Sequence, residues 1–273
     1  MDKVIFTSGE PTLNPDLNLL IQKAKSFQYS QISLTTNGRM LAYKQYAEQL
    51  INSGLNEIIV SIHGHNAKTH ESLTRTKGSF DQTLNGIKNI SDLRKKFNVK
   101  LIIAVTLNKK NYLYFENVVS SFFKFDISEI TFNIVQPLGT FMEKHFNSLM
   151  PRYSDVAIII EDFYKKNKTI FYQKRKNCYY RVISIIDLPF CQSKILSEYM
   201  GYGEKRVVED IKKEDNKFIN ELDTIIFNDN KDLKIKQDAC NLCKYDSACN
   251  GIYINYIKRF GWKEFRPVID SPR

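Results

Sequence analysis

The sequence predicts an α/β fold with a parallel sheet. Short, apolar, β-rich runs alternate along the chain with longer segments whose apolar residues recur at helical spacing. Repeated strand–helix units of this kind are joined by right-handed crossovers, which bring successive strands together in one parallel sheet. A partial parallel (β/α) barrel is the first interpretation, and a doubly wound sheet is the alternative. With 273 residues, 42% of them hydrophobic, the chain can bury a substantial core in one or two domains.

The expected elements follow one another regularly up to about residue 135. Short runs rich in apolar residues predict strands at residues 3–7, 31–36, 57–62, 99–107 and 129–135. Segments with apolar residues near a 3.6-residue period predict helices at residues 17–27, 41–52, 80–97 and 114–123. In the second of these helices, Tyr46, Ala47 and Leu50 fall on one face, and Gly54 is a typical C-terminal stop.

Composition excludes several classes of protein. The net charge is +10, and a basic, Tyr-rich stretch at residues 165–181 could follow a phosphate backbone. Such a run is more typical of a solvated helix face or loop, so nucleic acid is not the expected partner. The N-terminus has no signal-peptide core, and the apolar run at residues 156–160 is too short to cross a bilayer. We therefore expect a cytoplasmic protein without a membrane partner.

Polar residues and glycines gather where each predicted strand ends. The first strand runs into Ser8-Gly9-Glu10-Pro11, in which the glycine allows close approach of a ligand and the glutamate offers an acceptor. The other four strands end in residues 35–38, 61–66, 106–108 and 133–139. Ligands of parallel barrels lie over the carboxyl ends of the strands. We therefore expect a small-molecule site along this edge.

These strand ends resemble the radical S-adenosylmethionine (SAM) enzymes over residues 3–139. Ser8–Pro11 is similar to the family's Gly-Gly-Glu-Pro motif, and Thr36-Asn37-Gly38 matches the usual end of the next strand. Residues 60–64, 78–87 and 132–139 are similar to later parts of the same barrel. The resemblance implies SAM as a cofactor, held by Ser8, Gly9, Glu10, Pro11, Asn37, Ser61, His63, Asn108, Val135 and Pro137.

The resemblance also implies a role for several of these residues. Glu10 would hold the methionine amine, and Ser61 and His63 would contact the ribose or the carboxylate. Asn108 and residues 135–137 would border the adenine. A complete enzyme of this family cleaves SAM reductively to a 5'-deoxyadenosyl radical, abstracts hydrogen from an organic substrate and takes its electron from a donor such as ferredoxin or flavodoxin.

The family's Cys-x-x-x-Cys-x-x-Cys loop, which binds the radical-generating [4Fe-4S] cluster, is absent from this chain, because no cysteine precedes Cys178. One explanation is a fragment that lacks the loop and the first barrel strand, and that is inactive alone. The other is a non-catalytic SAM-binding or iron–sulfur-binding partner protein. An uncovered edge at residues 3–7 would be an association liability, which favours the fragment.

A second set of candidate ligands lies near the C-terminus. Cys240, Cys243 and Cys249 form a Cys-x2-Cys-x5-Cys run, which in a reducing compartment favours metal binding over disulfides. Cys191 is the first candidate for the fourth ligand and Cys178 the second. The spacing leaves open zinc, a [4Fe-4S] cluster, or buried thiols in a small helical hairpin.

With its aromatic tail, this C-terminal segment resembles the extension of radical SAM enzymes that carry an auxiliary cluster. The resemblance implies one auxiliary [4Fe-4S] cluster. That subset is rich in enzymes that modify peptides and proteins, so it also implies a peptide or protein among the candidate substrates. The expected domains are a partial barrel at residues 1–150, a linking helical region at 151–190 and the Cys-rich extension at 191–273.

A histidine pair supports a different class of enzyme. His63 and His65 alternate at the end of a predicted strand, so both imidazoles would point to the same face. A zinc-dependent hydrolase on a barrel would present two ligands in this way. A hydrogen-bonding role for His63 and a plain loop position for His65 are the alternatives.

Overall fold

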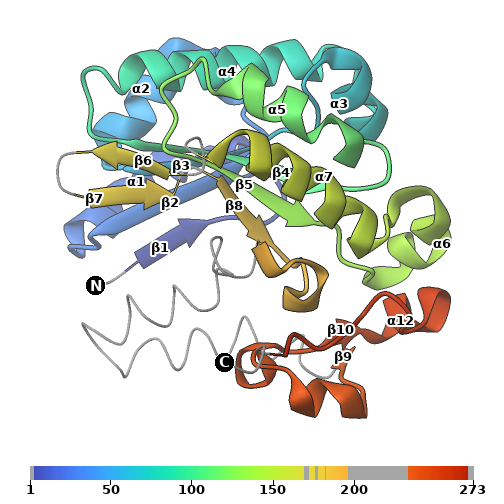
Figure 1. Ribbon diagram of the computed structural model, residues 1–273. Coiled ribbons are helices and arrows are strands. Elements are labelled where there is room, and N and C mark those ends of the chain that lie inside the picture. Colours follow the sequence, from blue (N-terminus) through green and yellow to red (C-terminus); the bar gives the residue numbers. More distant parts are fainter. Residues whose placement is uncertain (1–2, 169–171, 176–177, 182, 196–232, 270–273) are drawn as a thin grey trace. The chain divides into compact units, whose positions relative to one another are not determined.

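The computed structural model of the chain describes residues 3–168, 172–175, 178–181, 183–195 and 233–269 (Figure 1). The chain divides into two compact units, each made of segments that are far apart in the sequence. The first unit comprises Met1–Leu107, Tyr114–Phe132 and Thr169–Ile183, and the second comprises Asn108–Leu113, Asn133–Lys168 and Ser184–Arg273. These units group the residues differently from the boundaries expected near residues 150 and 190, which stay a prediction.

The sheet confirms the expected α/β class. Its strand order is β1-β2-β3-β4-β5-β8, and the pairs β1–β2, β2–β3 and β3–β4 are parallel. The strands are β1 (Lys3–Phe6), β2 (Gln31–Thr36), β3 (Glu57–Ser61), β4 (Lys100–Leu107), β5 (Glu129–Ile134) and β8 (Ile183–Ile186). Among the described strands this order is open, with β1 at one end and β8 at the other, so no closed barrel forms there.

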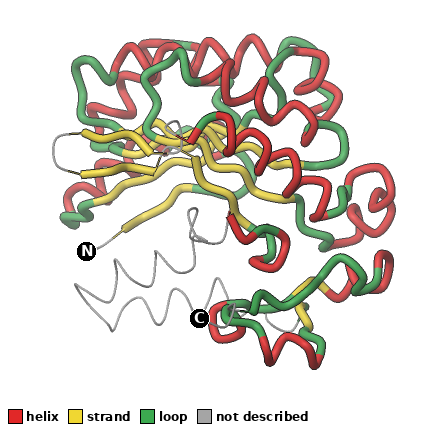
Figure 2. Tube along the Cα trace, in the orientation of Figure 1, coloured by secondary structure: helices red, strands yellow, loops and turns green. Residues whose placement is uncertain are grey.

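The predicted helices of the first unit all occur. Figures 1 and 2 show α2 to α5 along one side of the strands β1 to β4. The α-helices are α1 (Leu17–Ser26), α2 (Lys44–Ser53), α3 (Ala67–Thr74), α4 (Ser79–Leu93) and α5 (Phe115–Phe122). The short 3-10 helices are η1 (Pro11–Leu13) and η2 (Met40–Ala42). A third, η3 (Tyr112–Tyr114), includes residues of both units. The sequence did not predict α3.

The helix expected at residues 41–52 is interrupted near its start. Tyr43 takes an extended conformation between η2 and α2, with φ −82° and ψ 97°. The side-chain amide of Asn89 on α4 donates to the carbonyl oxygens of Leu41 and Ala42, at 3.0 and 2.9 Å. These carbonyls would otherwise accept hydrogen bonds of a continuing helix, so a tertiary contact decides where α2 begins.

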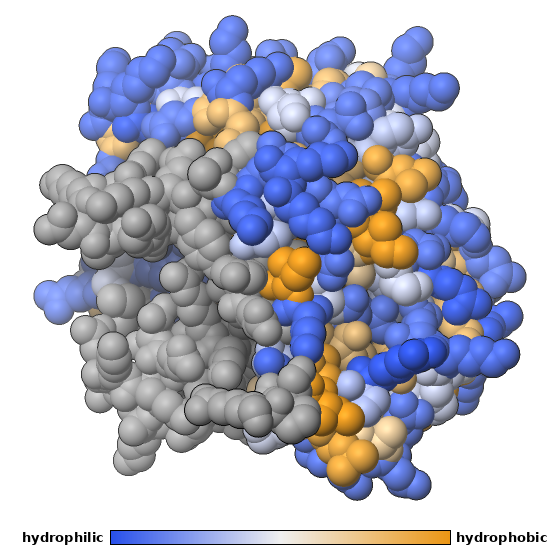
Figure 3. All heavy atoms as spheres, in the orientation of Figure 1, coloured by the Kyte–Doolittle hydropathy of each residue, from blue (hydrophilic) through white to orange (hydrophobic). Residues whose placement is uncertain are grey.

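The apolar core of the first unit lies between its strands and helices. Leu34, Val60 and Ile103 on the strands are fully buried, as are Leu50 on α2 and Ile87 on α4. Burying such side chains is the main driving force for folding. On the face drawn in Figure 3, polar side chains cover most of the described surface and apolar ones form small patches.

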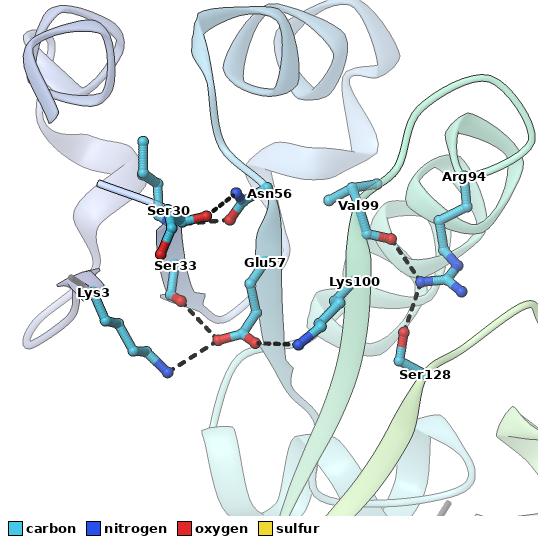
Figure 4. Close-up of polar contacts among 10 residues, drawn as sticks. Lys3, Ser30, Ser33, Asn56, Glu57, Arg94, Val99, Lys100 and Ser128 are labelled. Carbon is cyan, nitrogen blue, oxygen red and sulfur yellow. Dashed lines mark hydrogen bonds and ion pairs between the residues drawn. The ribbon is translucent and has the colours of Figure 1, made fainter. Parts of the chain in front are cut away.

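A buried carboxylate joins the amino ends of four strands (Figure 4). Glu57 begins β3 and is 4% exposed. It accepts hydrogen bonds from Ser33 on β2 at 2.7 Å and from Lys3 on β1 at 3.2 Å, and Lys100 on β4 lies 3.9 Å away. Burial raises the pKa of Glu57, but the Ser33 hydrogen bond and the Lys3 charge outweigh it, so the pKa lies below its ordinary value. This cluster stabilises the amino ends of the strands, whereas the candidate site lies at their carboxyl ends.

The described part of the second unit combines helices with a short antiparallel pair of strands. It holds α6 (Gly139–Leu149), α7 (Tyr153–Lys166) and α12 (Ile254–Phe260), with η4 (Phe190–Gln192), η5 (Asp238–Leu242) and η6 (Asp246–Ala248), and the antiparallel strands β9 (Lys234–Ile235) and β10 (Ile252–Tyr253). Tyr153 stacks on Tyr256 at 4.4 Å, and the Tyr256 hydroxyl donates to Glu264 at 2.5 Å and accepts from the Tyr153 N–H at 3.0 Å. These contacts fix α7 against the C-terminal extension.

The segment at residues 151–190 differs from the helical region that the sequence predicts. Among the described residues of this segment, α7 is followed by β6 (Tyr172–Arg175) and β7 (Cys178–Arg181), which form an antiparallel pair before β8. The basic, Tyr-rich stretch therefore includes two strands. Within the described part of the chain, no helix has the length and apolar character needed to cross a membrane.

Candidate functional site

The turn after β1 has an unusual backbone. Ser8 and Gly9 both take left-handed conformations, with φ of 73° and 56°. A Cβ atom at Gly9 would meet no other atom within 4 Å, so the backbone faces open space there. A left-handed serine is strained, and such strain is concentrated at binding sites and active sites. The structure thus leaves room for a ligand beside the predicted residues Ser8 and Gly9.

Glu10 is held firmly at this strand end. Its Oε1 accepts hydrogen bonds from the N–H of Thr12 at 3.1 Å, the hydroxyl of Thr12 at 2.6 Å and the hydroxyl of Thr36 at 2.6 Å. Its Oε2 accepts from the N–H of Asn37 at 2.7 Å. A carboxylate has about four acceptor positions, two on each oxygen. Oε1 is therefore saturated, whereas Oε2 can accept one further donor.

The same contacts explain the local fold. Glu10 is the N-cap of η1, and Pro11 occupies the first position of that turn, where a missing N–H costs nothing. Because Phe6 on β1 pairs with Leu34 on β2, the two strand ends lie beside each other. The carboxylate thereby joins the ends of β1 and β2.

Gly38 completes the end of β2. Its φ is 76°, and a Cβ atom would lie 2.6 Å from Cγ1 of Val60 on β3. The Thr83 hydroxyl on α4 donates to the Asn37 carbonyl at 2.9 Å, and the Gly38 N–H donates to Thr36 at 3.1 Å. The predicted residue Asn37 is therefore fixed through its backbone by the neighbouring strand and helix.

His63, just after β3, contacts His70 on α3. The His63 N–H donates to Nδ1 of His70 at 3.1 Å, and His63 Nδ1 accepts from the Thr106 N–H at 3.4 Å. The two rings stack at 6.0 Å. Burial lowers the pKa of His63, and burial together with His63 lowers the pKa of His70 to about 4. Both imidazoles are therefore neutral near pH 7, and with Ser61 they offer hydrogen bonds at this strand end.

In the described residues, His63 and His65 belong to no group of three or more His, Cys, Asp or Glu side chains that could hold a metal ion. His63 uses Nδ1 for the Thr106 N–H, and His65 Nε2 lies 2.7 Å from the Asn66 side-chain amide. His65 also packs against Tyr114 at 5.0 Å. A zinc ligand needs a nitrogen lone pair that is directed at the metal. The hydrogen-bonding role of His63, which was the alternative interpretation, agrees with this geometry.

Three further predicted residues belong to the second unit. Asn108 is buried, and its side chain accepts from the Lys110 N–H at 2.9 Å. Pro137 is buried as well, and its carbonyl accepts from Asn255 at 3.1 Å. Val135 is half-buried. Their placement beside an adenine stays a prediction.

The second unit brings the C-terminal cysteines together. One pocket is lined by Cys191, Cys240, Cys243 and Cys249, and by the apolar side chains of Phe190, Ile252, Trp262 and Phe265. The sequence chose Cys191 as the fourth member of this set, whereas the side chain of Cys178 lies outside the part that the structure describes.

The surroundings of these thiols suit a bound cluster. Burial and the neighbouring thiols of Cys249, Cys243 and Cys240 raise the pKa of Cys191 to about 12, so a positive group is needed to hold it as a thiolate. The Gly251 N–H points at Cys249 Sγ and the Val268 N–H at Cys243 Sγ, each at 3.4 Å. Hydrogen bonds to sulfur are typical of iron–sulfur ligands. No three His, Cys, Asp or Glu side chains in the described residues lie close enough to share a single metal ion.

Sequence reasoning missed several residues of these sites. Thr12 binds Glu10 through both backbone and side chain, and the Glu-Pro-Thr order of an N-cap turn could have indicated it. His70 lies seven positions after His63 on the unpredicted helix α3 and carries no local signal. Asp187, which ends β8 with φ 64° and accepts from Gln136 at 2.7 Å, was also not foreseen.

The first unit thus has a parallel α/β sheet with a fixed carboxylate at adjacent strand ends, which is the edge where such sheets bind small molecules. Residues 1–121 match the family model of the Radical SAM superfamily, in agreement with the resemblance that the strand ends implied.

The chain is also similar to curated proteins named "Probable GTP 3',8-cyclase". It is 37% identical over 93 residues to that of Saccharolobus islandicus strain Y.N.15.51, which is 34% of this chain and 29% of that protein. The Saccharolobus solfataricus protein is 36% identical over the same length. The Methanopyrus kandleri protein is 30% identical over 139 residues, covering 50% of this chain and 42% of that protein. The matches thus cover less than half of these relatives.

Proposed function

We propose that the first unit binds SAM through its methionine end, with Glu10 as the acceptor for the amine. The observation that carries this proposal is the single remaining acceptor position on Oε2, in a carboxylate that four donors already hold in place. An ammonium group bound there forms a charge-assisted hydrogen bond, which is stronger than a neutral one. Because the carboxylate is oriented before the ligand arrives, little entropy is lost on binding.

The neighbouring strand ends supply the remaining contacts of this half of the site. The open turn at Ser8 and Gly9 lets a ligand approach the backbone, and Asn37 follows at the end of β2. Ser61 and the neutral His63 would contact the ribose or the carboxylate, since a neutral imidazole both donates and accepts hydrogen bonds. Pro11 stiffens the exit from the turn.

We also propose that the second unit holds one auxiliary [4Fe-4S] cluster on Cys191, Cys240, Cys243 and Cys249. Four thiolates around one zinc ion would stand about 3.8 Å apart, given a Zn–S distance of about 2.3 Å. In a [4Fe-4S] cluster each thiolate binds a different iron, so the sulfurs stand further apart. The four cysteines line one apolar pocket, and in the described residues they form no site for a single metal ion. This arrangement favours a [4Fe-4S] cluster over one zinc ion.

The activity that we propose for the whole protein is that of a radical SAM enzyme. With SAM bound to the family's radical-generating [4Fe-4S] cluster, which is distinct from the auxiliary cluster, one-electron reduction would cleave SAM into methionine and a 5'-deoxyadenosyl radical, and this radical would abstract hydrogen from an organic substrate. The side chains described above bind and orient the methionine end and exclude water around the thiols. A peptide or protein is the substrate class that we favour, because of the Cys-rich extension. The name of the relatives supports GTP as the second candidate, although the matches cover only 29–42% of their length.

Equilibrium dialysis with SAM and with 5'-methylthioadenosine tests the role of Glu10. The second compound lacks the amine and carboxylate of the methionine. Glu10→Gln should weaken SAM binding about 10-fold to 150-fold, corresponding to the 1.5–3 kcal/mol of a charged hydrogen bond, and leave 5'-methylthioadenosine unaffected. Glu116→Gln, at an exposed site on α5, is the matched control. Equal losses for both ligands would contradict the proposal.

Anaerobic reconstitution with iron and sulfide tests the cluster. We expect about four irons per chain, and their loss in Cys240→Ala with Cys243→Ala. Cys191→Ala should lower the iron content further than Cys178→Ala does. Zinc, or no metal, would refute the auxiliary cluster and would leave the SAM proposal untouched.

A further inference from the structure

A second pocket of the second unit has a different chemical character from the cysteine pocket. Its volume is about 280 Å³, and it is lined by Pro137, Glu143, Phe146, Asn255, Lys258 and Arg259. These residues come from the loop after β5, from α6 and from α12. No cysteine lines it, and it shares no lining residue with the cysteine pocket.

The floor of this pocket is well packed. Phe146 is 4% exposed, and its ring lies 5.3 Å from that of Phe260. The Arg152 guanidinium covers the Phe260 ring at 4.5 Å. Asn255 donates to the Pro137 carbonyl at 3.1 Å and so ties α12 to the loop after β5. A pocket with such fixed walls is preformed, which favours ligand binding.

The charges at its mouth favour an anion. Lys258 and Arg259 are adjacent, and both side chains are exposed. The Arg259 guanidinium lies over the Phe146 ring, with its central carbon 5.7 Å from the ring centroid. Glu143 is the single carboxylate of the lining, and it forms no ion pair with either cation in this described part of the chain. Two cations thus face one anion, and neither is neutralised by it.

The size of the pocket limits the ligand. Sites for whole cofactors and drug-sized ligands reach about 300–1,000 Å³. A volume of about 280 Å³ lies just below this range and suits a small acidic group. A planar guanidinium matches carboxylate and phosphate oxygens with two parallel hydrogen bonds, and the adjacent lysine adds a point charge.

We propose that this pocket binds an acidic group, either a carboxylate or a phosphate, through Arg259 and Lys258. If the proposed function holds, the acidic group belongs to the substrate, since the pocket adjoins the loop that follows β5. The binding itself does not depend on SAM or on iron.

Side-chain NMR of the full chain tests the proposal. The Arg259 Nε–Hε resonance is assigned by its loss in Arg259→Lys. Inorganic phosphate and sodium acetate are titrated separately at constant ionic strength, which keeps the screening of charges equal. We expect a saturable shift of this resonance with phosphate, with acetate or with both, and the pair of titrations shows which oxyanion the pocket prefers.

Three variants show whether the binding uses this pocket. Lys258→Gln should raise the dissociation constant at least about 5-fold, and Glu143→Gln should lower it, because it removes the opposing charge. Lys263→Gln, an exposed residue outside the lining, is the control and should change nothing. The absence of a saturable shift with both anions, or equal effects of all three variants, would overturn the proposal. Either result leaves the SAM and cluster experiments intact.

Discussion

Replacing Glu10 by glutamine should destabilise the first unit even when no ligand is present. In the native protein, Oε1 faces three donors and Oε2 faces the Asn37 N–H at 2.7 Å. A glutamine can keep its oxygen at the three-donor position, but its NH2 group then faces the Asn37 N–H. The substitution removes a charged hydrogen bond and places two donors together. The expected loss is about 1.5–3 kcal/mol in the free energy of unfolding.

Urea unfolding followed by circular dichroism measures this loss. Thr36→Val removes one of the hydroxyl donors, and the double variant with Glu10→Gln completes a double-mutant cycle. The two residues are in direct contact at 2.6 Å, so we expect a coupling of about 0.5–3 kcal/mol. The reasoning is refuted if Glu10→Gln changes the free energy of unfolding by less than about 0.5 kcal/mol, or if the two substitutions are additive.

Three further predictions concern pH and backbone strain. The pKa of Glu57 lies below its ordinary value of 4.5, so the unfolded state takes up this proton first as the pH falls. The free energy of unfolding should therefore decrease as the pH drops below 4.5. Glu57→Gln should flatten this part of the profile when urea unfolding is measured at pH 3–7. The pKa of His70 is lowered from 6.5 to about 4, so stability should also fall as the pH drops between these values, and the His70 ring proton should titrate near pH 4 rather than 6.5 by NMR. Gly38→Ala adds a Cβ atom 2.6 Å from Val60 at φ 76°, and should lower the free energy of unfolding by about 2–4 kcal/mol. Gly78→Ala, at φ 78° in open space, should lower it by only about 1–2 kcal/mol. Equal shifts of the thermal unfolding midpoint in the two variants would contradict this reasoning.

Periodicity predicted the elements of the first unit well where local burial decides them. The strand expected at residues 31–36 is β2 (Gln31–Thr36), and the helix expected at residues 17–27 is α1 (Leu17–Ser26). Periodicity was less accurate where a side chain distant in the sequence determines the end of an element. Asn89 on α4 ends η2 before α2 begins, and no property of residues 40–44 reveals this.

The later part of the chain shows the same limit. The sequence predicted a linking helical region at residues 151–190, but in the described part of this segment α7 is followed by the strands β6, β7 and β8. Short basic and aromatic runs are compatible with a helix face, a loop or a hairpin, so the choice depends on pairing between segments. The Cys-x2-Cys-x5-Cys run, in contrast, could be recognised directly, because ligand spacing is a local property.

The sequence alone determined the Ser-Gly-Glu-Pro turn, the order of the strand ends and the cysteine spacing. The turn and the strand ends predicted the resemblance to the radical SAM family, whose model matches residues 1–121. Only the tertiary structure decided that Glu10 is held by Thr12, Thr36 and Asn37, and that Cys191 lines the same pocket as Cys240. The physical reason is that residue type and spacing specify which groups are present, whereas hydrogen-bond partners, burial and the resulting pKa values depend on which distant segments pack around them.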